Sequence, residues 1–216
     1  MSLRVAPVAF ALSALLAGCI PGVLGNGDVV SETRSVSSFL ALDVSNSLEV
    51  RIDVDPAASA DVELTLEAES NLIDLVRTEV DGDVLDATVV EPVAPTEAML
   101  VTGTVARIEG IRASNSSRVA VDGVDLPTLE VVASNSSKVA VRGVADLLSL
   151  DVQNSADADL EDLPVLDAEV DLSNSASATI CASGIVSGRV TNSARLTVLC
   201  GGDASGVEVT NSGRVE

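Results

Sequence analysis

Apolar and polar residues alternate in short runs along most of the chain after residue 28. In the run 129–133, Leu129, Val131 and Ala133 fall on one face, and Glu130 and Val132 fall on the other. A period of two residues predicts β-strands with one buried face. A helix does not fit these runs, because they are β-branched, lack a 3.6-residue period and are interrupted every few residues by Gly or Asn.

An Asn-Ser pair separates the alternating runs and returns at nearly constant intervals of 20, 19, 20, 18 and 19 residues. Its fullest copies, RASNSSRVAVDG at 112–123 and VASNSSKVAVRG at 132–143, are almost identical. A period of this size is typical of a solenoid, in which each coil buries its apolar face only by stacking on the next. We therefore predict an all-β fold, a right-handed parallel β-helix or solenoid with coils of about 19–20 residues.

The Asn-Ser pairs predict the corners of these coils, because Asn tolerates the left-handed backbone conformation and bonds to nearby backbone groups. Corners in register would stack their side-chain amides into a ladder. The predicted ladder consists of Asn115, Asn135, Asn154, Asn174, Asn192 and Asn211. The SNSS motif is thus interpreted as scaffold, and Lys138 as a solvent-facing strand residue equivalent to Arg118 one repeat earlier.

The N-terminus has the features of a bacterial lipoprotein signal. Arg4 precedes an apolar run too short for a membrane span, and the run ends in Leu16-Ala17-Gly18-Cys19, which resembles a lipobox. We expect residues 1–18 to be the signal peptide, Cys19 to carry the lipid and residues 19–27 to form a Pro/Gly tether. Ile20, where an Asp would suggest inner-membrane retention, favours the outer membrane. Residues 28–216 then form one domain, with a less regular part at 28–106 and regular coils at 107–216.

Composition narrows the range of functions. Without Arg4, the remaining 11 basic and 33 acidic residues give a net charge of −22, so nucleic acid is not an expected partner. The chain contains no His, Trp or Tyr. A histidine-based triad, an imidazole metal site and aromatic sugar platforms are therefore excluded. No cofactor is expected.

Two smaller features have competing interpretations. Cys181 and Cys200 lie 19 residues apart, about one coil, which suggests a disulfide between neighbouring coils. Counted from the Asn of each coil, however, they differ by one position, so two free thiols are the alternative. Asp81, Asp83 and Asp86 loosely suggest a calcium loop, but an Asp-Gly hairpin explains the same residues, and no metal ligand is assigned.

The chain resembles the autotransporter-adhesin head GIN domain family of bacterial envelope proteins. The repeated strand, Ser-Asn-Ser turn and strand carry the resemblance, together with SETRSVSSFLALDVSNSLEVRIDV near the front and SNLIDLVRTEVDGDVLDATV after it. The second stretch implies a short helical turn at 72–75 and a hairpin at 81–82. The family has Ser-Gly-type corners where this chain has Ser-Asn-Ser. The resemblance implies an extracytoplasmic, adhesive role and supplies no enzymatic residues.

These observations predict a non-catalytic envelope lipoprotein, with a membrane as partner through its lipid and a structural or adhesive role for its acidic surface. A β-helix enzyme acting on polysaccharides and a calcium-binding envelope module are the alternatives. The NSGRVE sequence at 211–216 suggests an uncapped coil, so we also expect a protein partner or a second copy to associate at the C-terminal end.

Overall fold

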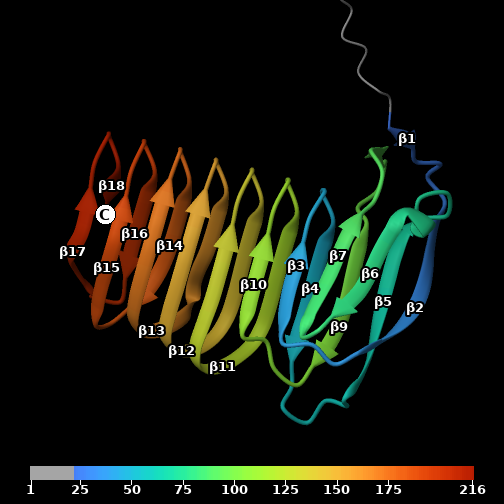
Figure 1. Cartoon of the computed structure of the whole chain (residues 1–216), viewed down its shortest axis with the longest axis horizontal. Helices are drawn as coiled ribbons and strands as arrows, with labels where there is room; N and C mark the ends of the chain where they lie inside the picture. Colours follow the sequence, from blue (N-terminus) through green and yellow to red (C-terminus); the bar gives the residue numbers. More distant parts are fainter. Residues whose placement is uncertain (1–21) are drawn as a thin grey trace, which may run out of the picture.

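A computed structural model describes residues 22–216, which form an elongated all-β domain (Figure 1). Their single helical element is the short 3-10 turn η1 (Ile73–Leu75). The strands are β1 (Val23–Leu24), β2 (Val29–Ser37), β3 (Ala41–Val44), β4 (Glu49–Val54), β5 (Asp61–Glu69), β6 (Val76–Asp81), β7 (Val84–Val89), β8 (Val93–Ala94), β9 (Leu100–Val105), β10 (Gly110–Ala113), β11 (Arg118–Ala133), β12 (Lys138–Gln153), β13 (Asp157–Ser173), β14 (Ser177–Ala182), β15 (Ile185–Val190), β16 (Arg195–Leu199), β17 (Asp203–Val209) and β18 (Arg214–Val215).

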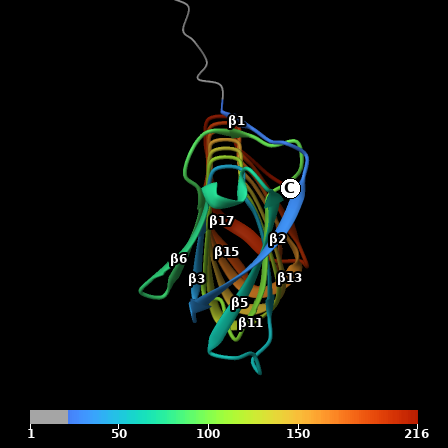
Figure 2. The same cartoon turned by 90° about the vertical axis from the view of Figure 1, so that its right-hand side faces the viewer.

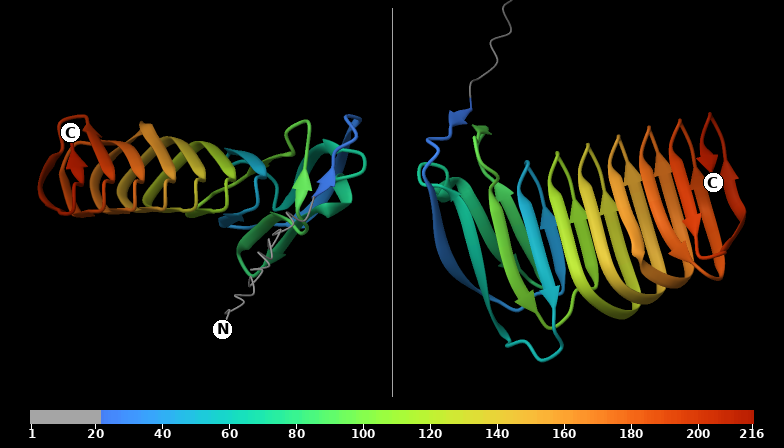
Figure 3. Two further views of the ribbon diagram at one scale, coloured as in Figure 1. Left: turned by 90° about the horizontal axis from the view of Figure 1, so that it is seen from above. Right: turned by 180° about the vertical axis from the view of Figure 1, so that it is seen from behind.

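The chain winds into a flattened solenoid with two walls, which Figure 3 shows from above and from behind. We define wall A as the strands that lead into the Asn-Ser corners, which are β3, β10, the second halves of β11, β12 and β13, then β15 and β17, together with β7 and β6, which continue the same sheet. Wall B contains the strands that leave the corners, which are β4, the first halves of β11, β12 and β13, then β14, β16 and β18, together with β9, β5 and β2, which continue from β4. Equivalent strands of neighbouring coils pair in parallel, as Arg118 does with Lys138. The predicted parallel β-solenoid is therefore confirmed.

The core is a stack of aligned apolar side chains between the walls. Leu129 pairs in register with Leu148, Leu148 with Ala168, and Ala168 with Val186, and all four are buried. Residues between them along each strand point outward, as the two-residue period requires. Each coil thus adds one layer to a continuous core.

One regular coil lies earlier in the chain than the sequence analysis placed it. β3 pairs with β10, and β4 pairs with the first half of β11, so residues 41–54 form the coil directly before 110–122. Residues 55–109 are inserted between these two neighbouring coils. The sequence analysis did not find this repeat within 28–106, because a long insertion separates it from the coils that it joins in space.

The insertion builds a cap over the N-terminal end of the solenoid. It contains antiparallel pairs, β6 with β7 and β5 with β9, and β2 pairs antiparallel with β5 (Figure 2). The predicted helical turn is present as η1, and the predicted Asp81-Gly82 hairpin joins β6 to β7. Antiparallel strands end the parallel stacking at this end of the molecule. Within the described residues, the last coil, β17 with β18, pairs with neighbours on one side only.

Residues 22–27, which we call the N-terminal strap, are folded onto the cap. β1 pairs with β8, and Asn26 donates its side-chain amide to Ser70 Oγ at 2.8 Å. A Cβ on Gly22 would lie 2.7 Å from the Pro92 backbone, so the strap passes too close for any other residue. Residues 22–27 of the expected 19–27 tether are therefore folded against the cap. Residues 1–21, including the predicted signal peptide and Cys19, lie outside the described residues.

Candidate functional site

The Asn-Ser corners line one long edge of the solenoid, which we call the Asn–Ser edge. At every corner both residues have positive φ, between 48° and 60° for Asn and between 62° and 66° for Ser. In six corners the turn is closed by a backbone hydrogen bond across it, such as that from Ser137 N to Ser134 O at 3.2 Å. Two successive residues of positive φ match a type I′ turn, which gives each coil a narrow reversal.

The corners are joined by two sets of hydrogen bonds that run in opposite directions. The Nδ2 of each Asn donates to the Oδ1 of the Asn one coil earlier, over 3.0–3.2 Å. The backbone N–H of each Ser donates to the carbonyl of the Asn one coil later, over 3.0–3.1 Å. The ladder contains the six predicted residues, Asn115, Asn135, Asn154, Asn174, Asn192 and Asn211, in chain order.

The sequence analysis missed a seventh rung. Asn46 accepts the hydrogen bond from Asn115 and donates its own amide to Thr88 Oγ1 and to the Val89 carbonyl, each at 3.0 Å. Its distance of 69 residues from Asn115 hid it from a search for a fixed period. The signal was present nonetheless, since Val44-Ser-Asn-Ser repeats the pattern Ala113-Ser-Asn-Ser.

The fourth residue of the SNSS motif is a buried part of the scaffold. Ser117 and Ser137 are both fully buried. Ser117 Oγ donates to the Val44 carbonyl at 3.0 Å and accepts from Ser114 N at 3.1 Å. Because a buried hydroxyl needs such partners, the fourth Ser of the motif is explained by folding.

Cys181 and Cys200 form a disulfide in the structure, with their Cα atoms 5.1 Å apart. In the strand register, Cys181 faces Leu199, which explains the offset of one position. Cys200 follows directly in a turn, with a φ of 67°, and this turn directs it back to Cys181. The bond links the coil of β14 to that of β16.

We expect replacement of both cysteines by alanine to lower the free energy of unfolding by about 2–3 kcal/mol, because the disulfide closes a 19-residue loop. Urea denaturation of the purified domain measures this difference. Reduced wild-type protein is the control and should match the variant. Equal stability of the oxidised wild type and the variant would show that the bond does not hold the C-terminal coils together.

The acidic DGDVLD stretch forms a hairpin. Asp81 and Asp83 flank Gly82 in the turn, whereas Asp86 lies on β7 and forms an ion pair with Arg77 at 2.6 Å. Among residues 22–216 there is no group of three or more His, Cys, Asp or Glu side chains placed to hold a metal ion. These residues also include no helix long and apolar enough to cross a membrane.

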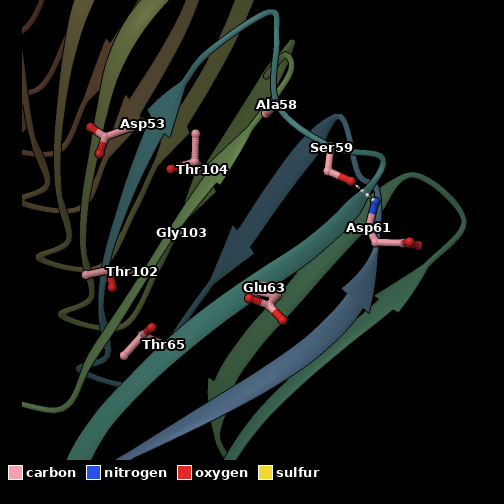
Figure 4. Close-up of a pocket in the computed structure, with 9 residues that line it drawn as sticks. All are labelled: Asp53, Ala58, Ser59, Asp61, Glu63, Thr65, Thr102, Gly103 and Thr104. Carbon is pink, nitrogen blue, oxygen red and sulfur yellow. Dashed lines mark hydrogen bonds between the residues drawn. The ribbon is translucent and has the colours of Figure 1, made fainter.

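A depression of about 680 Å³ lies on the outside of wall B, where β5 diverges from β9 (Figure 4). Its lining is acidic and hydroxylic: Asp53, Ala58, Ser59, Asp61, Glu63, Thr65, Thr102, Gly103 and Thr104. Asp53 and Asp61 lie at opposite ends of it in Figure 4. The lining can accept hydrogen bonds and attract cations.

A buried carboxylate holds the strap, and nothing in the sequence pattern indicated it. Glu69 is fully buried at the end of β5. Its oxygens accept hydrogen bonds from Thr96 Oγ1 at 2.6 Å, Gly27 N at 2.6 Å and Thr96 N at 2.9 Å. A Cβ on Gly25 would overlap this carboxylate. The hydrogen bond from the Thr96 hydroxyl and those from backbone N–H groups lower the pKa of Glu69, against the opposing effect of burial.

This carboxylate predicts an acid-sensitive strap. Its lowered pKa means that the folded state gains stability above the ordinary value of 4.5 and loses it as the pH falls through the lower folded value. Glu69→Gln should therefore lower Tm at neutral pH, because the new NH₂ group would face donors only. The difference from wild type should shrink steadily below pH 4.5, which thermal melts across a pH series would show. A constant difference at all pH values would contradict a charged Glu69. Glu67→Gln, at an exposed position of the same strand, is the control.

Together, the edge, the disulfide and the cap define a β-solenoid domain closed at one end by antiparallel strands. The family model described as "Putative auto-transporter adhesin, head GIN domain" matches residues 38–202. The chain therefore belongs to this family, and the resemblance seen in the sequence is confirmed. No match was found among curated proteins.

Solved structures share the fold. A putative adhesin from Bacteroides fragilis superposes with a TM-score of 0.69 at 14% identity, covering 90% of this chain and 98% of that one. A putative adhesin from Parabacteroides merdae gives a TM-score of 0.57 at 14% identity, with coverages of 91% and 98%. A putative lipid binding protein from Parabacteroides distasonis gives 0.52 at 15%, with coverages of 89% and 98%. At such identities the comparison supports a common fold alone.

Proposed function

We propose that this protein is a non-catalytic adhesin of the bacterial envelope, anchored by lipid on Cys19 and displayed at the cell surface. The observation that carries the proposal is the solenoid itself, a rigid acidic scaffold of a family described as adhesins. Its ladder, disulfide and cap give a fixed surface, and its polar groups are used for folding. A pre-ordered surface suits adhesion because little conformational entropy is lost on contact.

The lipid anchor is supported by the lipobox-like Leu16-Ala17-Gly18-Cys19 and by the folded strap that begins three residues after Cys19. Expression of the full chain in a bacterium, followed by membrane fractionation and mass measurement of the N-terminal peptide, tests it. We expect a membrane-bound protein whose N-terminal residue is an acylated Cys19, and release of Cys19→Ser into the soluble fraction. An unmodified wild-type protein in the soluble fraction would refute the anchor.

The enzyme alternative would have to use the acidic depression of wall B. We expect the wild type, Glu63→Gln and Asp53→Asn to be equally inactive on a panel of polysaccharides. If the wild type cleaved a polysaccharide and either substitution abolished the cleavage, the protein would be an enzyme and the adhesin proposal would be refuted. Association at the C-terminal end stays a prediction, which follows from the one-sided pairing of β17 and β18. Sedimentation of the protein as a monomer in analytical ultracentrifugation would argue against a second copy there.

A further inference from the structure

The Asn–Ser edge is electrically neutral in a strongly acidic protein. Its seven corners, each taken with the three residues on either side of the Asn, contain six acidic and six basic residues. The rest of the chain contains 27 acidic and six basic residues. The negative charge is therefore carried by the outer walls and the opposite edge. The seven windows are 43–49, 112–118, 132–138, 151–157, 171–177, 189–195 and 208–214.

The edge also presents exposed cations in neighbouring coils. Arg118 and Lys138 are exposed, adjacent in register on wall B, and belong to none of the ion pairs among the described residues. Glu49 precedes this pair in the row and Asp157 follows it. Arg195 lies three coils after Lys138 in the same row, pairs in register with Arg214 and forms an ion pair with Glu216 at 3.8 Å. Neighbouring like charges repel one another, so the two adjacent pairs of cations do not stabilise the fold by their own contact.

The strap leaves the molecule at this same edge. Asn46 at the first corner bonds to the Val89 carbonyl, and the chain continues to Pro92, whose carbonyl accepts from Val23 N at 2.9 Å. Figures 1 and 2 show β1 on the side of the solenoid where the Asn-Ser corners lie. The Glu69 contacts fix the strap, so its direction of exit is part of the fold.

Exposed apolar side chains surround the exit. Val23, Leu24 and Val90 are 39%, 69% and 51% exposed. Gly22 follows Cys19 by three positions in the sequence, a span of about 10 Å at most. A lipid on Cys19 would therefore hold this end of the edge, with its apolar side chains, against the bilayer surface.

We propose that the Asn–Ser edge is the surface this protein turns toward a membrane of anionic phospholipid headgroups. The inference rests on the proposed lipid anchor. Anionic headgroups repel carboxylates and attract Arg and Lys within roughly a Debye length of 8–10 Å. An anchored protein with a net charge of −22, since Arg4 is lost with the signal peptide, keeps its acidic walls away from such a surface and places its neutral edge against it. The exposed corner amides and hydroxyls offer hydrogen bonds to phosphate oxygens.

The test uses the lipidated full chain on vesicles of phosphatidylethanolamine and phosphatidylglycerol that contain a headgroup-quencher lipid. A fluorophore is attached to Ser136→Cys on the edge or to Thr128→Cys on the opposite side of the same coil. Both side chains are exposed, and the native cysteines are blocked by the disulfide and by lipid. Cys200 already has a φ of 67°, close to the 64° of Ser136, so cysteine fits that corner.

We expect the label at position 136 to lose most of its fluorescence and the label at position 128 to lose little. Equal quenching at both positions, or stronger quenching at 128, would overturn the edge proposal while leaving the anchor intact. Failure of the protein to float with the vesicles would refute the anchor, and the edge proposal with it. In a second variant, Ser116→Glu with Ser175→Glu should reduce quenching at 136, whereas Thr128→Glu should not. An unchanged signal in the double variant would remove the electrostatic basis of the proposal.

Discussion

Replacing Asn154 with valine should lower the free energy of unfolding by about 3–4 kcal/mol. Asn154 has a φ of 53°, a conformation that costs a β-branched residue roughly 1–2 kcal/mol. The substitution also removes the amide bonds to Asn135 at 3.1 Å and Asn174 at 3.0 Å, each contributing about 1 kcal/mol. Urea denaturation followed by circular dichroism measures the loss.

Asn154→Gly is the matched control, because glycine keeps the left-handed backbone and removes only the side-chain bonds. We expect it to cost about 1–2 kcal/mol, less than valine. If valine and glycine were equally destabilising, the backbone conformation of the corner would contribute nothing. If both matched the wild type, the asparagine ladder would be a geometric by-product of stacking.

Leu148→Ala should be the most damaging single truncation in the regular coils, at about 4 kcal/mol. Leu148 is fully buried between Leu129 and Ala168 of the neighbouring coils. Because Ala168 is already small, the cavity left by the substitution cannot be filled from that side. The adjacent Leu147→Ala, at a position that is 41% exposed, is the control and should change stability by less than about 0.5 kcal/mol. Similar losses for both variants would contradict the inward and outward assignment of this strand.

The regular part of the fold could be predicted from the sequence, because the period-two alternation and the repeat of about 19 residues can both be detected along one continuous stretch of the chain. The Asn-Ser corners followed from the local conformational preference of Asn, and the stack of Leu129 on Leu148 from the repeat itself. The pairing of β3 with β10 could not be predicted in the same way. An insertion of 55 residues separates these coils, and no period spans it.

The strap shows a second limit of the sequence. Its Gly-rich composition resembles a flexible tether, and Glu69 looks like one acidic residue among 33. Their relation appears only in three dimensions, where the Gly25 backbone approaches a buried carboxylate 44 residues away. The cysteine pair could be predicted only in part. Its spacing suggested the disulfide, but the spacing did not predict the turn at Cys200, which compensates for the offset of one position between the two cysteines.

The most direct test of the proposed adhesin is accessibility on living cells. An epitope is inserted at Gly82 in the β6–β7 hairpin, where a Cβ meets nothing within 4 Å, and antibody labelling is compared on intact and permeabilised bacteria. Surface display predicts labelling of intact cells at the level seen after permeabilisation. Labelling that requires permeabilisation would place the solenoid inside the envelope and contradict an adhesive role.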